Sequence, residues 1–231
     1  MISKLRISGV ILLTIVICYS GLFMAKKFGI TEGIITNIIL YGSMLISTFI
    51  FLKIIDKKSF ESIGLRSQKG LKKYCIALAI IAIIPIGISF LFNGTINFKK
   101  MFPLELIKIA LFNFMVGFSE EFFVRGYIYS AINNEKLKIP LSAALFSLLH
   151  IISPEFNFML FILLFLIGIF FALAFYFIKN LWPLIIFHSV WNIFTNITDS
   201  YQNILISLTT YIIMIGVIII LNKKDFIIKS L

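Results

Sequence analysis

Residues 158–178 read FMLFILLFLIGIFFALAFYFI, a run of 21 residues without a charged side chain. An α-helix rises about 1.5 Å per residue, so a helix of this length crosses the roughly 30 Å hydrocarbon core of a bilayer. The run is too long and too uniformly apolar for an ordinary surface helix. It predicts a transmembrane helix over 158–178.

The remainder of the chain repeats this pattern. Of 231 residues, 60% are hydrophobic and 13% are charged, against about half and about a quarter in soluble domains. We expect an all-α, polytopic transmembrane helix bundle of about eight membrane helices, with residues 1–231 as a single integral-membrane domain. This composition excludes a soluble enzyme, a secreted disulfide scaffold and a disordered chain. The other predicted spans are 7–25, 34–52, 74–92, 104–131, 140–152, 181–196 and 204–221.

The basic residues predict the orientation of the bundle. The chain carries 21 Lys and Arg against 10 acids, and they flank the apolar runs, so membrane topology explains the charge better than nucleic-acid binding does. Fifteen basic residues fall on the side of the N-terminus and four on the other side, which predicts that both termini are cytoplasmic. The basic segment 53–73 is expected to contact anionic lipid. The Ile-, Lys- and Asn-rich composition resembles that of bacteria with AT-rich genomes, so we expect a multi-pass protein of a bacterial cell membrane.

A few polar side chains interrupt the predicted spans at a common depth. Such residues are costly in a membrane and are functional candidates. Glu120 lies about 16 Å from the cytoplasmic end of its span, His150 about 15 Å, and His188 and Asn192 about 10 and 16 Å, by the helical rise. Three helices therefore bring these side chains to one layer of the membrane.

Helical spacing assigns different directions to these groups. Glu121 and Arg125 are four residues apart and can form an ion pair, whereas Glu120 lies about 100° away around the helix. His188 and Asn192 share a face by the same spacing. A glutamate and a histidine can activate a water, and a second histidine with an asparagine can donate to an oxyanion. The pattern is typical of a hydrolase that acts on a carbonyl.

Three motifs in this region resemble a known family. Glu120-Glu121-Phe-Phe-Val-Arg125 resembles its EExxxR motif, Phe146-Ser-Leu-Leu-His150 its FxxxH motif, and His188-Ser-Val-Trp-Asn192 its HxxxN/D motif. The family is the CPBP family, which comprises the type II CAAX prenyl endopeptidases and their bacterial relatives, also called Abi or bacteriocin-processing proteins. The resemblance covers residues 105–196 as a catalytic core, and residues 1–92 add N-terminal membrane helices.

The resemblance implies an intramembrane endopeptidase of glutamate type, which hydrolyses a peptide bond in a membrane-associated protein or peptide. Glu120 and His150 would activate the attacking water, His188 and Asn192 would form the oxyanion hole, and Glu121 and Arg125 would organise the site. No cofactor is expected. The alternative is a zinc ion held by Glu120, His150 and His188, because family members have been described as metalloproteases.

Two other functions fit the same residues. One is a non-cleaving bacteriocin-immunity or peptide-binding membrane protein. The other is a proton-coupled transporter that uses Glu120 and His150 as a relay. The intact base and oxyanion residues favour cleavage, and the absence of internal repeats in the sequence weighs against transport.

Overall fold

The protein is an all-helical bundle. The computed structural model describes residues 2–30, 33–67, 71–198 and 203–222, and within these ranges the chain forms eight long helical segments. Four are apolar and long enough to cross a membrane, and they cover Lys4–Lys27, Gly33–Ile55, Tyr74–Asn93 and Phe158–Ile178, with a shorter apolar helix at Ile204–Ile220. These helices are those of a multi-pass membrane protein. The predicted all-α class is confirmed.

The helices in chain order are α1 (Ile2–Lys27), α2 (Gly33–Phe49) with a π-helical end η1 (Ile50–Ile55), a short 3-10 turn η2 (Phe60–Ile63), α3 (Leu71–Asn93), α4 (Pro103–Glu120), α6 (Glu135–Leu148) with a 3-10 end η4 (Leu149–Ile152), α7 (Phe158–Ile178), α8 (Leu181–Ile197) and α9 (Ile204–Leu221). The helix α4 runs without interruption through a π-helical stretch η3 (Glu121–Ile128) into α5 (Tyr129–Ala131).

Two predicted spans, 158–178 and 204–221, coincide with α7 and α9. The span predicted at 140–152 instead begins at Glu135. Its first turn is polar, and the Asn134 side chain accepts a hydrogen bond from the backbone amide of Lys136, which caps the helix before the apolar run begins. The basic residues 223–231 that contributed to the predicted orientation lie outside the described residues, as do residues 68–70 of the basic segment.

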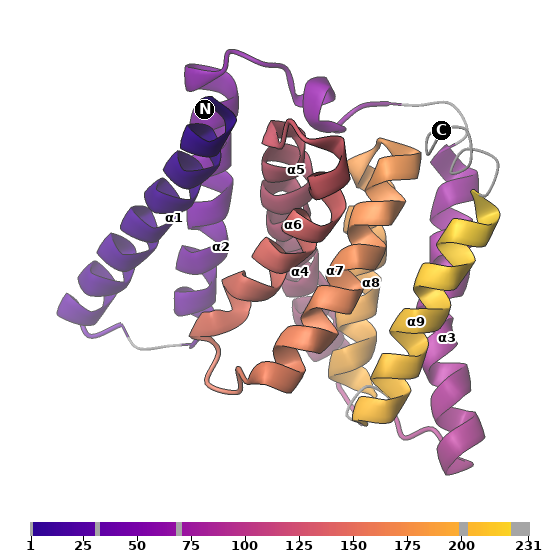
Figure 1. Cartoon of the computed structure of the whole chain (residues 1–231). Helices are drawn as coiled ribbons and strands as arrows, with labels where there is room; N and C mark the ends of the chain where they lie inside the picture. Colours follow the sequence, from indigo (N-terminus) through magenta and orange to yellow (C-terminus); the bar gives the residue numbers. More distant parts are fainter. Residues whose placement is uncertain (1, 31–32, 68–70, 199–202, 223–231) are drawn as a thin grey trace.

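The helices do not follow chain order in space. At one edge α1 packs against α2, which contacts α4, and α4 packs against α8 in the centre of the bundle. The pair α6 and α7 packs together, and α7 contacts α9. The helix α3 lies at the opposite edge from α1 and α2, where it contacts α8 and α9 (Figure 1). The first described residues of α1 and the end of α9 lie at the same end of the bundle.

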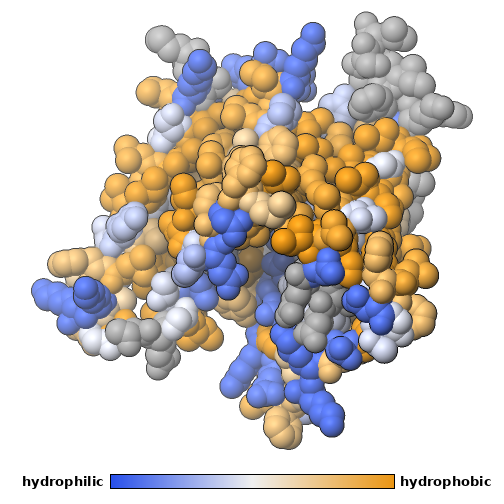
Figure 2. Space-filling model, turned by 60° about the horizontal axis from the view of Figure 1, so that its bottom comes forward, coloured by the Kyte–Doolittle hydropathy of each residue, from blue (hydrophilic) through white to orange (hydrophobic). Residues whose placement is uncertain are grey.

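The outer surface of the bundle is apolar. Side chains such as Phe23, Leu91 and Ile220 are 68%, 82% and 72% exposed, as expected of residues that face lipid rather than water. Figure 2 shows that hydrophobic residues dominate the visible face, while hydrophilic residues gather in its middle and at its upper and lower rims. Charged residues are therefore uncommon on the central helices, and three of them, Glu120, Glu121 and Arg125, are buried.

Candidate active site

Four side chains predicted from the three motifs line one internal cavity. Glu120 comes from the end of α4, His150 from η4, and His188 and Asn192 from α8, and the cavity has a volume of about 170 Å³. Glu120 and His188 are 5% and 4% exposed. The predicted convergence of three helices at one depth thus brings these residues together.

A close approach of α4 and α8 positions the first part of the site. A Cβ atom at Gly117 would lie 2.7 Å from the Ser189 Oγ and 3.1 Å from its backbone nitrogen. Real Cβ atoms do not come so close, so only glycine lets the two backbones meet here. The contact lies one turn before Glu120 and next to His188, and it therefore sets the distance between the carboxylates and the imidazole.

Glu121 links an arginine and a histidine. Its Oε1 atom lies 3.0 Å from Arg125 Nη1 and 2.9 Å from His188 Nδ1, and Glu121 and Arg125 are both fully buried. The Nε2 atom of the same imidazole lies 3.7 Å from Glu120 Oε2. Both glutamates therefore face His188, one at each ring nitrogen. The predicted ion pair of Glu121 and Arg125 is present, but sequence reasoning missed the contact between Glu121 and His188.

Arg125 is held on several sides. Its Nη2 donates a hydrogen bond of 3.3 Å to the backbone oxygen of Gly168, and its guanidinium lies 4.3 Å and 4.9 Å from the ring centroids of Phe146 and Phe171. A Cβ atom at Gly168 would lie 3.0 Å from the Cα of Ala143, so glycine also brings α6 and α7 into contact here. Ion pairing, hydrogen bonding and ring stacking together fix this cation in the core.

The partners of the two histidines determine where their protons lie. The carboxylate of Glu121 beside Arg125 only accepts, so His188 carries hydrogen on Nδ1 and turns Nε2 toward Glu120. The Nδ1 atom of His150 lies 2.9 Å from the backbone oxygen of Phe146, which also only accepts. In its neutral form His150 therefore keeps Nε2 as a hydrogen-bond acceptor.

The helix winds differently from a regular α-helix at the site. From Glu121 to Ile128 it is π-helical, and all eight residues are buried. Such stretches are rare in proteins as a whole, but those that occur are often found at functional sites, because they redirect side chains over a short length. The stretch contains Glu121 and Arg125 and begins directly after Glu120, so the change in winding affects all three charged residues.

The cavity also has walls that the motifs did not predict. Tyr41 from α2 and Tyr211 from α9 line it, and both lie outside the predicted core of 105–196. Trp191 and Phe171 contribute aromatic surface. A single tyrosine within an apolar run carries no signal that distinguishes a cavity wall from a lipid contact, so these two tyrosines could not be predicted from the sequence.

The zinc alternative does not fit the donor geometry. Among the described residues, no three His, Cys, Asp or Glu side chains lie close enough to hold one metal ion. Glu120 and His188 approach each other, but His150 does not complete a set of three with them, and Nδ1 of His188 is engaged by Glu121.

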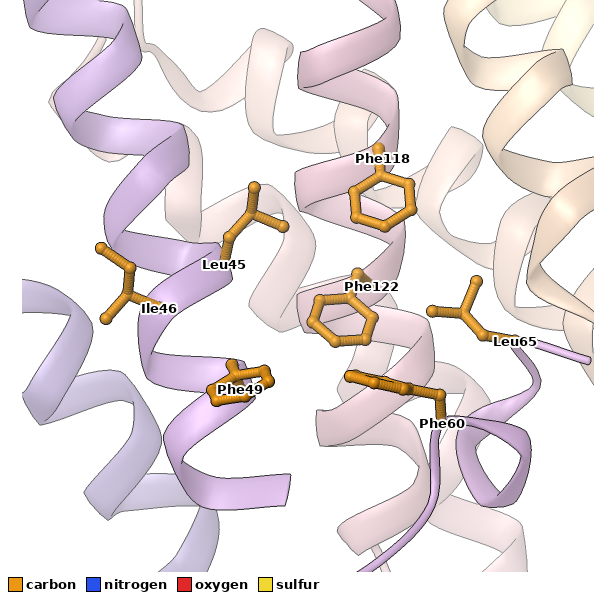
Figure 3. Close-up of a pocket in the computed structure, with 7 residues that line it drawn as sticks. All are labelled: Leu45, Ile46, Phe49, Phe60, Leu65, Phe118 and Phe122. Atoms are coloured by element: carbon orange, nitrogen blue, oxygen red, sulfur yellow. The ribbon is translucent and has the colours of Figure 1, made fainter. Parts of the chain in front are cut away.

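A second hollow lies beside the same helix and is chemically different. An apolar groove of about 460 Å³ lies between α2, η2 and the continuous helix of α4 and η3, and Figure 3 draws the side chains that line it. The centroids of the stacked Phe118 and Phe122 rings lie 5.7 Å apart, and the Phe122 and Phe60 centroids lie 6.1 Å apart. The groove shares no lining residue with the cavity that contains Glu120. The groove and the cavity are therefore separate hollows on the same helix.

The comparison with known proteins agrees with the position of the site. Residues 102–194 match the family model described as type II CAAX prenyl endopeptidase Rce1-like. This range contains all three motifs and the four cavity residues Glu120, His150, His188 and Asn192. No curated protein matches the chain.

Proposed function

Because residues 102–194 form an Rce1-like type II CAAX prenyl endopeptidase domain of the CPBP family, we propose that the protein is an intramembrane endopeptidase. It hydrolyses a peptide bond in a membrane-associated protein or peptide with a water activated by Glu120 and His150. Eight helices cross a bacterial cell membrane with both termini in the cytoplasm, and the cavity is entered from that side or laterally from lipid.

The observation that carries this proposal is the shared cavity. Glu120, His150, His188 and Asn192 line one space of about 170 Å³ inside an apolar bundle. The Glu120 carboxylate and the His150 imidazole can accept protons or hydrogen bonds from a water molecule. They face the same space as the His188 imidazole and the Asn192 amide, which can donate hydrogen bonds. A protein that only binds a peptide needs no such combination of base and donors.

The reaction runs through a tetrahedral intermediate without a covalent enzyme adduct. The water oxygen attacks the peptide carbonyl carbon while its proton passes to the Glu120 carboxylate, with His150 Nε2 accepting a hydrogen bond from the same water. The oxyanion is held by His188 Nε2–H and the Asn192 amide. Glu120 then delivers the proton to the leaving nitrogen, the carbon–nitrogen bond breaks, and an acid and an amine are released.

Charge balance supports His188 as the donor. Glu120 and Glu121 bring two negative charges and Arg125 one positive charge to a buried cluster. A proton on His188 brings the cluster to neutrality, and unpaired charge in a dry interior is costly. With Nδ1 bonded to Glu121, the added proton lies on Nε2, the atom that faces Glu120 and the cavity.

The test measures cleavage directly with two synthetic probes. A peptide with a farnesylated C-terminal CAAX sequence and its unprenylated counterpart are incubated with the purified full chain in water enriched in oxygen-18, and the products are analysed by mass spectrometry. Hydrolysis places one heavy oxygen on each new carboxyl group. Loss of the base reduces general-base catalysis by about 10²–10⁴-fold, so Glu120→Gln should abolish measurable cleavage of whichever probe the wild type cuts.

The matched control lies on the same helix. Glu105 accepts a hydrogen bond from the backbone amide of Phe102 at the start of α4, and a glutamine can accept there too, so Glu105→Gln should cleave at the wild-type rate. Wild-type cleavage by Glu120→Gln refutes the proposed base. Retention of a probe without cleavage by the wild type supports the non-cleaving binding or immunity function instead.

A further inference from the structure

A polar pocket lies at the end of the bundle where α5 ends and α6 begins, away from the proposed active site. It has a volume of about 350 Å³. Among the described residues that line it, three are basic, Arg66, Lys138 and Lys179, and one is acidic, Glu61. The pocket shares no residue with the cavity that contains Glu120.

Two loops far apart in sequence build this pocket by docking on each other. The backbone oxygen of Gly64 accepts a hydrogen bond of 2.9 Å from the Leu181 amide, and the Asn180 side chain donates one of 2.8 Å to the backbone oxygen of Arg66. Asn180 is fully buried. The segment that follows η2 is thereby fixed against the turn between α7 and α8, which brings Arg66 and Lys179 to the same pocket.

Tyr129 forms the buried wall of the pocket. Its side chain is 2% exposed, and its hydroxyl has no hydrogen-bond partner among the described residues. The Lys138 and Lys179 ammonium groups lie 5.6 Å and 5.7 Å from the centre of its ring. A buried hydroxyl without a partner is costly, so a ligand that accepts its hydrogen bond is stabilised here.

The charges around the pocket select the ligand. Glu135, on the first turn of α6, lies 2.5 Å from the Lys138 ammonium and offsets part of its charge. Arg66 and Lys179 together exceed the single charge of Glu61 in the wall. Three cationic groups and a phenolic donor form a donor set suited to a group with several acceptor oxygens and a negative charge.

We propose that this pocket binds a phosphate group, with the Tyr129 hydroxyl and the Lys138, Lys179 and Arg66 cations as its donors. The phosphate comes either from an anionic lipid headgroup at the membrane surface or from a free phosphate. The site does not depend on the proposed proteolytic function, because neither its residues nor its ligand take part in cleavage.

The first experiment measures the unfolding temperature of the detergent-solubilised full chain as inorganic phosphate replaces chloride at constant ionic strength. We expect saturable stabilisation of the wild type. Tyr129→Phe removes one oxygen, and Lys179→Gln removes one charge with nearly the same side-chain length, and each should raise the half-saturating phosphate concentration about tenfold. The matched control is Lys136→Gln, which removes an exposed lysine of α6 outside the pocket and should behave as the wild type.

The second experiment distinguishes the two sources of phosphate. Native mass spectrometry compares retention of phosphatidylglycerol and phosphatidylcholine supplied at equal mole fraction. Preference for phosphatidylglycerol that Tyr129→Phe abolishes supports a lipid headgroup, and saturable binding of inorganic phosphate without that preference supports a free phosphate. Absence of both effects overturns the proposal. An equal loss of phosphate binding in Lys136→Gln and Lys179→Gln also overturns it, because that result indicates general attraction to a basic surface.

Discussion

Removal of the Arg125 guanidinium should destabilise the whole bundle. Arg125 is fully buried, pairs with Glu121 at 3.0 Å, donates to the Gly168 oxygen and packs against two phenylalanine rings. Arg125→Ala removes the arginine partner of the Glu121 carboxylate, and breaking a buried ion pair in this way costs about 3–5 kcal/mol in protein interiors. At about 2–4 °C per kcal/mol for a chain of this size, we expect the melting temperature to fall by about 6–20 °C.

The assay is the thermal unfolding of the purified protein in detergent, together with its yield in membranes. Lys108→Ala removes an exposed cation from the same helix and serves as the control. The double variant Glu121→Gln with Arg125→Met removes both charges and should recover most of the lost stability, because neither partner then leaves an uncompensated buried charge. If Arg125→Ala retains wild-type yield and melting temperature but lacks activity, the reasoning is refuted and Arg125 belongs to the catalytic group.

Four further outcomes are expected. Gly117→Ala should lower both stability and cleavage by forcing α4 from α8, whereas Gly216→Ala in α9, where an added Cβ meets nothing within 4 Å, should be neutral or stabilising in a thermal melt. His150→Gln should lose activity with an unchanged melting temperature, since its one described hydrogen bond is to its own helix; a large drop in melting temperature would indicate a structural role instead. Tyr127→Phe removes a hydrogen bond of 3.1 Å to the buried Asp56 carboxylate and should cost about 1.5–3 kcal/mol in chemical unfolding. Phenanthroline should leave cleavage unchanged, and inhibition that added zinc reverses would contradict the metal-free mechanism.

The helices could be predicted from the sequence because a membrane-spanning helix is specified by the hydropathy of its own continuous run of residues. The run 158–178 is apolar throughout and is bounded by Asn157 and Lys179, so its limits coincide with α7. The start of α6 was missed because Glu135 and Lys138 resemble a loop by composition. They form a polar first turn that Asn134 caps and an ion pair joins, and neither effect depends on hydrophobicity.

The site was predicted in part for a different reason. The helical rise places Glu120, His150, His188 and Asn192 at one depth in the membrane. This depth can be calculated for each helix without knowing which helices pack against it. The contact of Glu121 with His188 depends on which helices adjoin, on the glycine that brings α4 to α8, and on the π-helical winding after Glu120. The stacking of Arg125 on Phe146 and Phe171 could not be predicted either, because 26 phenylalanines give a sequence reader no basis for choosing two.

The position of α3 has a consequence for how the protein is made. This helix ends at Asn93 but packs against α8 and α9, and α9 ends only at Leu221. A ribosome that adds about 5–20 residues per second needs roughly 6–26 s for that interval. During this time α3 resides in the bilayer with at least one of its packing partners missing, and its contact with α9 forms only after α9 has emerged. Truncation before Ile204 should therefore leave the α9-facing side of α3 uncovered and accessible to membrane quality-control proteases, although Glu120, His150, His188 and Asn192 would already have been synthesised.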